Sequence, residues 1–106
     1  MEKILKKVQD RKILTDDELD KLVEYLLLEG SKLYQGHVLK LKGYTPKQLE
    51  SIQESISTLS DVMLHIFNYY SGHTSAYDQM KMLQMRGRLY FIEGFIDGLQ
   101  TARKEN

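Results

Sequence analysis

Residues 49–70, LESIQESISTLSDVMLHIFNYY, carry the most regular pattern in the chain and decide its fold class. Apolar residues recur there at alternating spacings of three and four across three heptads: Leu49, Ile52, Ile56, Leu59, Met63, Ile66 and Tyr70. This spacing places the apolar side chains on one face of an α-helix, and its persistence resembles the seam of a coiled coil. The stretch therefore predicts a long amphipathic helix with one buried side.

The same helix start signal occurs twice in the chain. Thr45 and Gln48 form a capping box, and Pro46 between them suits the first helical position. Thr15 and Glu18 form a second box, so another helix should begin at the residue after Thr15. With only one proline in 106 residues, little interrupts these helices once they have begun.

The remaining boundaries follow from apolar spacing and turn residues. We expect a short amphipathic helix within residues 2–12, and a second from near Asp16 to about Tyr34, ending near Gly36. The third should end at Ser71–Gly72. A fourth should start at Ser75, which has Asp78 three residues further on as its start signal, and run to about Arg103. Residues 36–43, GHVLKLKG, read as a loop whose leucines tuck under the helices. A short strand is the alternative, but a lone strand leaves both edges unpaired.

These elements predict an all-α fold, an antiparallel bundle of three long helices plus the short N-terminal helix, in a single domain over residues 1–106. An extended helical hairpin completed by a second chain is the alternative, because the heptads of residues 49–70 also suit a coiled coil.

Composition excludes several classes of protein. Fifteen basic and fifteen acidic residues give no net charge, so the molecule as a whole is not drawn to nucleic acid. The absence of cysteine excludes disulfides and thiolate metal sites. No apolar run has membrane-spanning length, and the N-terminus MEKILKKVQD has no signal-peptide core, so we expect a cytoplasmic protein without a membrane contact.

The fourth predicted helix contains three glycines in the stretch RGRLYFIEGFIDGLQ, residues 86–100. On a helical wheel they share a face with three large apolar residues, and we expect this set to be a partner or oligomer interface: Gly87, Gly94, Gly98, Met80, Leu83 and Phe91. A separate face should form the core: Met85, Leu89, Ile92, Ile96 and Leu99. Each glycine costs about 1 kcal/mol against alanine within a helix, so a reason for all three is needed.

Three readings of the glycine face stay open. The helix would be central to the bundle, with the glycines admitting a neighbour of the same chain. Alternatively the face meets a second copy or another protein. A kink at the glycines of a moving helix is the third reading.

Two carboxylates suggest an enzyme as an alternative function. Glu93 and Asp97 lie four residues apart on a polar strip with Arg86, where they would bind a divalent cation, contact a partner, or simply be solvated or paired with Arg86. Residues 59–70, LSDVMLHIFNYY, resemble the second metal helix of the all-α NTP pyrophosphatases. The resemblance implies a degenerate magnesium-dependent nucleotide hydrolase with Asp61 as a ligand. Position 58 is Thr58 where that family has glutamate, and the preceding Glu-x-x-Glu is missing.

The histidines show no pattern of a catalytic or metal site. His37, His65 and His73 lie at spacings unlike those of zinc ligands. His65 follows Asp61 by four residues, which suits either a surface pair or a general base. Nucleophile-elbow, P-loop and dinucleotide motifs are absent.

Two basic clusters keep a nucleic-acid-binding regulator among the alternatives. The N-terminal cluster contains Lys3, Lys6, Lys7, Arg11 and Lys12, and the second contains Lys40, Lys42 and Lys47. A helix-turn-helix would require a short helix after a tight turn, which the pattern does not show. We expect the N-terminal cluster to lie against the acidic start of the second helix instead.

The sequence therefore predicts a non-enzymatic protein-protein interaction module, without catalytic, cofactor or metal residues, that forms a homo-oligomer and binds a protein partner. Abundant tyrosine and methionine suit such a surface. Its size and composition are typical of small accessory or inhibitory proteins of bacteria and phages.

Overall fold

The computed structural model describes residues 1–105 and shows an all-α chain, which confirms the predicted fold class. The elements are α1 (Glu2–Gln9), α2 (Asp16–His37), the short 3-10 helix η1 (Leu41–Gly43), α3 (Pro46–Tyr69), the 3-10 helix η2 (Ser71–His73) and α4 (Ala76–Glu105). No strand occurs in this described part of the chain. The predicted domain also included Asn106, which lies outside the described residues.

The two predicted capping boxes fix the starts of α2 and α3. The hydroxyl of Thr15 accepts a hydrogen bond from the Glu18 N–H at 3.2 Å, and the Thr15 N–H donates to the Glu18 carboxylate at 3.0 Å. Thr45 and Gln48 repeat both contacts at 3.2 and 2.8 Å. Each box gives side-chain acceptors to two backbone N–H groups at the helix start that would otherwise lack partners, so both starts agree with the sequence.

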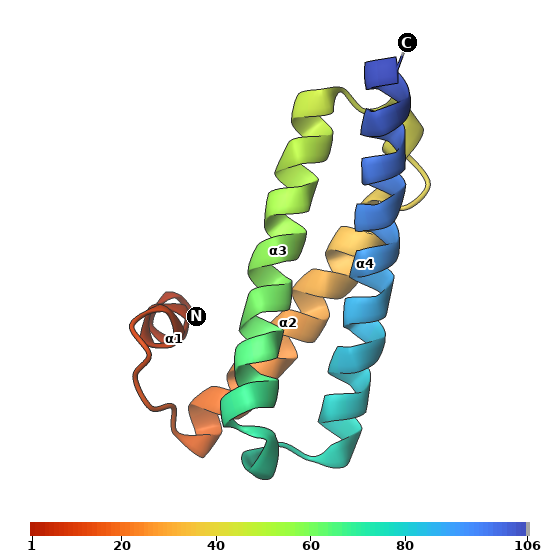
Figure 1. Cartoon of the computed structure of the whole chain (residues 1–106). Helices are drawn as coiled ribbons and strands as arrows, with labels where there is room; N and C mark the ends of the chain where they lie inside the picture. The colour runs from red at the N-terminus through yellow and green to blue at the C-terminus, as the bar shows by residue number, and fades with distance from the viewer. Residues whose placement is uncertain (106) are drawn as a thin grey trace.

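The long helices pack along one another, with α4 in contact with both α2 and α3. Figure 1 shows α3 and α4 side by side, α2 crossing behind them, and α1 to one side, where it contacts α2. The Arg103 guanidinium donates to the carbonyl of Tyr44 at 3.0 Å, so the end of α4 lies beside the start of α3. The molecule is 50 Å long, which is close to the roughly 45 Å expected for a helix of the length of α4.

Apolar stripes of the helices form the core. Six of the seven predicted α3 positions are buried, and the seventh, Tyr70, is half-buried and uses its hydroxyl as an acceptor. On α4 the buried residues are Met82, Met85, Leu89, Ile92 and Ile96, with Leu99 half-buried. The core face of α4 is therefore the predicted one, extended by Met82.

The connection between α2 and α3 is a turn followed by η1, not a strand. Leu41 is 2% exposed and packs into the core, whereas Leu39 is 95% exposed. The predicted tucked loop is thus correct for one leucine and wrong for the other, since only Leu41 points under the helices.

Helix α1 ends at Gln9, earlier than the predicted residue 12. The Lys12 N–H donates to the Lys7 carbonyl at 2.8 Å and the Arg11 N–H to the Val8 carbonyl at 3.1 Å, which is the Schellman pattern of helix termination. Arg11 has a φ of 56°, the left-handed conformation that this pattern requires and that glycine normally supplies. The chain turns here because Arg11 adopts the left-handed backbone conformation, which the spacing of apolar residues does not reveal.

Candidate functional site

The side of α4 that faces away from α2 and α3 is apolar along its length. Its residues, which we call the outward stripe, follow at spacings of three and four: Ala76, Met80, Leu83, Gly87, Phe91, Gly94, Gly98 and Ala102. All are exposed, and the three large side chains retain 49% (Met80), 57% (Leu83) and 61% (Phe91) of their accessible surface. The predicted interface residues are thus brought together on one surface, and that surface is uncovered in the single chain.

The glycines of the outward stripe do not admit a neighbour from the same chain. A Cβ atom added at Gly87, Gly94 or Gly98 would meet no heavy atom within 4 Å apart from the adjoining residues and backbone of its own helix. The reading in which these glycines allow close packing inside the bundle is therefore wrong. Helix α4 is buried on one side only, and its glycines face outward.

Close packing against a glycine occurs instead on α2. A Cβ atom at Gly30 would lie 2.7 Å from the Cγ atom and 2.8 Å from the sulfur of Met85. Gly30 follows the buried Leu26 by four residues, so it continues the apolar stripe of α2. That register was visible in the sequence and should have singled out Gly30.

Basic side chains beside the outward stripe fold back over aromatic rings. The Arg86 guanidinium lies 5.8 Å from the ring centre of Phe67 and 5.2 Å from that of Tyr90, and it also donates to the Tyr90 hydroxyl at 2.6 Å. On the other flank, Arg88 lies 5.9 Å from the ring of Tyr34 on α2. These cation–π contacts hold positive charge at the edges of the stripe and leave its centre apolar.

On the polar strip of α4, the expected pairing of Glu93 and Asp97 with Arg86 does not form among the described residues. Arg86 bonds to Tyr90, and no ion pair between Arg86 and either Glu93 or Asp97 occurs within residues 1–105. Asp97 accepts a hydrogen bond from the Gln53 side chain of α3 at 2.8 Å. The described residues contain no group of three histidine, aspartate or glutamate side chains arranged to hold a metal ion.

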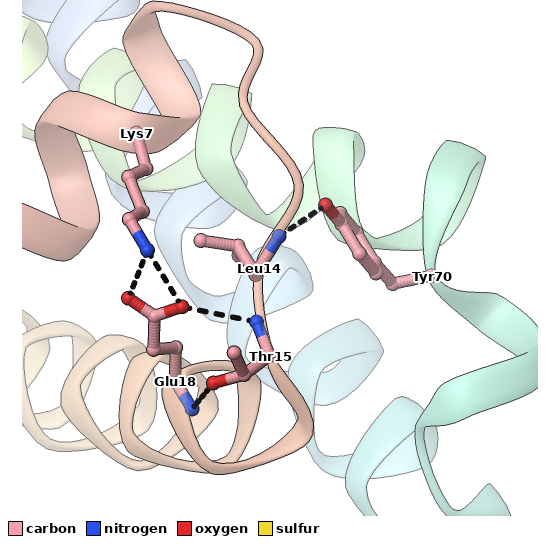
Figure 2. Close-up of polar contacts among 5 residues, drawn as sticks. All are labelled: Lys7, Leu14, Thr15, Glu18 and Tyr70. Atoms are coloured by element: carbon pink, nitrogen blue, oxygen red, sulfur yellow. Dashed lines mark hydrogen bonds and ion pairs between the residues drawn. The ribbon is translucent and has the colours of Figure 1, made fainter.

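The basic N-terminus lies against the start of α2 in part, as predicted. The Lys7 ammonium is 2.8 Å from one Glu18 carboxylate oxygen and donates to the other at 2.9 Å. Figure 2 shows how this contact joins the capping box of Thr15. The Lys7 contact, followed by the bond from the Thr15 backbone, lowers the pKa of the Glu18 carboxyl. Lys7 therefore links α1 to α2.

His65 does not pair with Asp61. Its ring lies 4.9 Å from that of Tyr69 and 5.9 Å from that of Tyr70, and no hydrogen bond to Asp61 occurs in the described chain. Burial lowers the pKa of His65, and the positive charge of Arg11 lowers it further. The predicted His65–carboxylate pair is thus replaced by an aromatic cluster.

Comparisons with protein-family models, with curated proteins and with solved structures find no match to this chain. None of the described helices has a stretch long and apolar enough to cross a membrane.

Proposed function

We propose that this protein is a non-enzymatic protein-interaction module that associates through the outward stripe of α4, and that the occupant of this stripe is a second copy of the chain. The observation that carries the proposal is the exposure of three large apolar side chains that share one uncharged helix face with three glycines. Exposed apolar surface of this kind is typical of a binding site.

The order of large and small residues favours a second copy in the antiparallel orientation. With residue 89 of each helix at the two-fold axis, Phe91 of one copy faces Gly87 of the other, and Met80 faces Gly98. Leu83 likewise lies close to the register of Gly94. Each large side chain then meets a position without one, as close packing requires. A parallel pair would set glycine against glycine and phenylalanine against phenylalanine.

Charge at the edge of the stripe favours the same orientation. In the antiparallel pair the same edges of the two helices meet, so Arg86 of one copy lies within one residue of the register of Glu93 of the other. In the parallel pair opposite edges meet, so Arg86 of one copy would lie near Arg88 of the other, which is unfavourable.

The area of the outward stripe sets the expected affinity of the two copies for each other. Residues 76–102 span roughly 40 Å of helix, and a contact about 10 Å wide would bury roughly 800 Å² over both copies. Stable interfaces usually bury about 1,200–2,000 Å², so the stripe suits a weak association in the micromolar range.

The test uses a charge at the centre of the stripe. Burying one phenylalanine stabilises by about 1.5–3 kcal/mol, and Phe91 would be buried in both copies, so Phe91→Glu should weaken dimerisation roughly a hundredfold or more. Leu39→Glu is the matched control, because Leu39 is also highly exposed but lies on the loop far along the chain from α4.

Light scattering during size exclusion should show a dimer for the parent and for Leu39→Glu, and a 12.4 kDa monomer for Phe91→Glu. Circular dichroism should show equal helicity in all three. A parent that stays monomeric, or a Phe91→Glu variant that dimerises like the parent, would contradict the proposal.

A further inference from the structure

A second surface, separate from the outward stripe, has the chemistry of a small binding site. A pocket of about 400 Å³ opens where the turn after α1 meets the end of α3 and η2. Its basic lining residues are Arg11, Lys12, His65 and His73. Its other lining residues are Ile13, Tyr69 and Tyr70. The volume lies at the lower end of the range of small-molecule pockets.

Positive charge in this pocket is largely uncompensated. Within residues 1–105 neither Arg11 nor Lys12 forms an ion pair. Acidic groups in this region are Asp10, which precedes Arg11 in the chain, Asp16, whose carboxylate is 3.7 Å from His73 Nδ1, and Asp61, which lines the adjoining groove with Arg11 and His65. Asp16 therefore offsets charge at the His73 end, whereas at the other end no carboxylate of residues 1–105 pairs with Arg11 or Lys12.

Arg11 and His65 line the same pocket, and the guanidinium charge acts on the ring. The guanidinium charge adds to the effect of burial in lowering the pKa of His65. An anion placed between these two groups would interact favourably with both, and it would also stabilise the protonated ring.

Tyr70 lines the same pocket and keeps one hydrogen-bond donor. Its hydroxyl oxygen accepts a bond from the Leu14 N–H at 3.0 Å, as Figure 2 shows. A phenol that accepts still carries its own proton, and in the described chain this proton has no acceptor. The Tyr69 ring, 63% exposed, lies at the same pocket and offers a flat apolar surface.

We propose that this pocket binds the phosphate group of a small molecule, free phosphate or a phosphate monoester. Guanidinium, ammonium and phenol donors suit the several acceptor oxygens of a phosphate, and arginine can contact two of them at once. The exposed Tyr69 ring would pack against an aromatic group carried by a monoester. The site uses no residue of the outward stripe, so it stands or falls independently of the proposed function.

The test is an NMR titration of the three histidines with inorganic phosphate, with phenyl phosphate, and with chloride at matched ionic strength. His65 and His73 signals should shift with saturation for phosphate but not for chloride, while His37, on α2 away from the pocket, stays unchanged. Tighter binding of phenyl phosphate would identify a monoester as the ligand, and equal binding would identify free phosphate.

Arg11→Asn removes the positive charge and should keep the fold, because asparagine tolerates the left-handed backbone at this position better than most residues. It should weaken phosphate binding roughly tenfold or more at unchanged helicity. Lys3→Gln on α1 removes one charge outside the pocket and should leave binding unchanged. Shifts that chloride reproduces, the absence of saturation, or an Arg11→Asn variant that binds like the parent would each overturn the proposal.

Discussion

Alanine substitution at Gly30 and Gly94 should change stability in opposite directions, although both residues are helical glycines. Alanine is favoured over glycine by about 1 kcal/mol inside a helix. At Gly94 nothing lies within 4 Å of the new methyl group, so Gly94→Ala should stabilise the folded monomer by about 1 kcal/mol.

At Gly30 the same propensity gain is opposed by a clash. The new methyl group would lie 2.7 Å from Met85 Cγ and 2.8 Å from its sulfur, and Met85 is 5% exposed. Overpacking of a buried site costs about 1–3 kcal/mol, which exceeds the propensity gain across most of that range. Gly30→Ala should therefore destabilise the protein by up to about 2 kcal/mol.

Urea unfolding followed by circular dichroism, at protein concentrations low enough to keep the chain monomeric, would measure both free energies. A difference of 1 kcal/mol corresponds to a shift of about 4–8 °C in Tm for a domain of this size. If Gly30→Ala were as stabilising as Gly94→Ala, Met85 would not pack against the α2 backbone and the account of the α2–α4 contact would be refuted.

Three further changes test the packing of the N-terminal segment and its pH response. Tyr70→Phe leaves the buried Leu14 N–H without its acceptor and should cost about 1–3 kcal/mol in urea unfolding; no change would mean that the 3.0 Å bond is not formed in solution. Glu18→Gln should keep the capping box but lose the Lys7 contact. Because the pKa of Glu18 is lowered in the folded protein, its contribution is present above the ordinary pKa and is lost as pH falls below about 4.5, so the variant should show a weaker acid dependence of Tm in that range. The pKa of His65 is also lowered in the folded protein, so protonation favours the unfolded chain below pH of about 6.5. The Tm of the parent should therefore fall as the pH decreases below that value, and His65→Gln should make this fall less steep. An equal slope in the parent and the variant would contradict the burial of this ring.

The sequence predicted the helices well because their signals are local. Thr15 and Thr45 begin helices through contacts within four residues, and the α3 heptads require only that one face be buried. The end of α1 was not predicted because Arg11 adopts a left-handed conformation, and arginine is not a residue type that indicates this conformation.

The candidate surface was predicted in its composition but not in its surroundings. The wheel placed Gly94 with Phe91, yet it could not say whether another helix of the same chain would cover them. That outcome depends on how α2 and α3 share the opposite side of α4, which is a tertiary property. The contact of Arg86 with Phe67 was unpredictable for the same reason, since Phe67 lies on a different helix, whereas Tyr90 lies four residues along α4.

The most direct test of antiparallel association through α4 is a distance between spin labels in the dimer. The chain has no cysteine, so Ala76→Cys and Ala102→Cys each introduce one labelling site at opposite ends of the outward stripe. Each residue lies 13 positions from residue 89, and at 1.5 Å per residue two equivalent labels should be roughly 40 Å apart along the helices.

A mixture of the two labelled variants should in addition show a short distance between residue 76 of one copy and residue 102 of the other, near the roughly 10 Å separation of packed helices. Pulsed electron resonance that finds these long and short distances would support the account. A short distance between two copies of residue 76, or no coupling between labels at concentrations above the expected micromolar range, would contradict it.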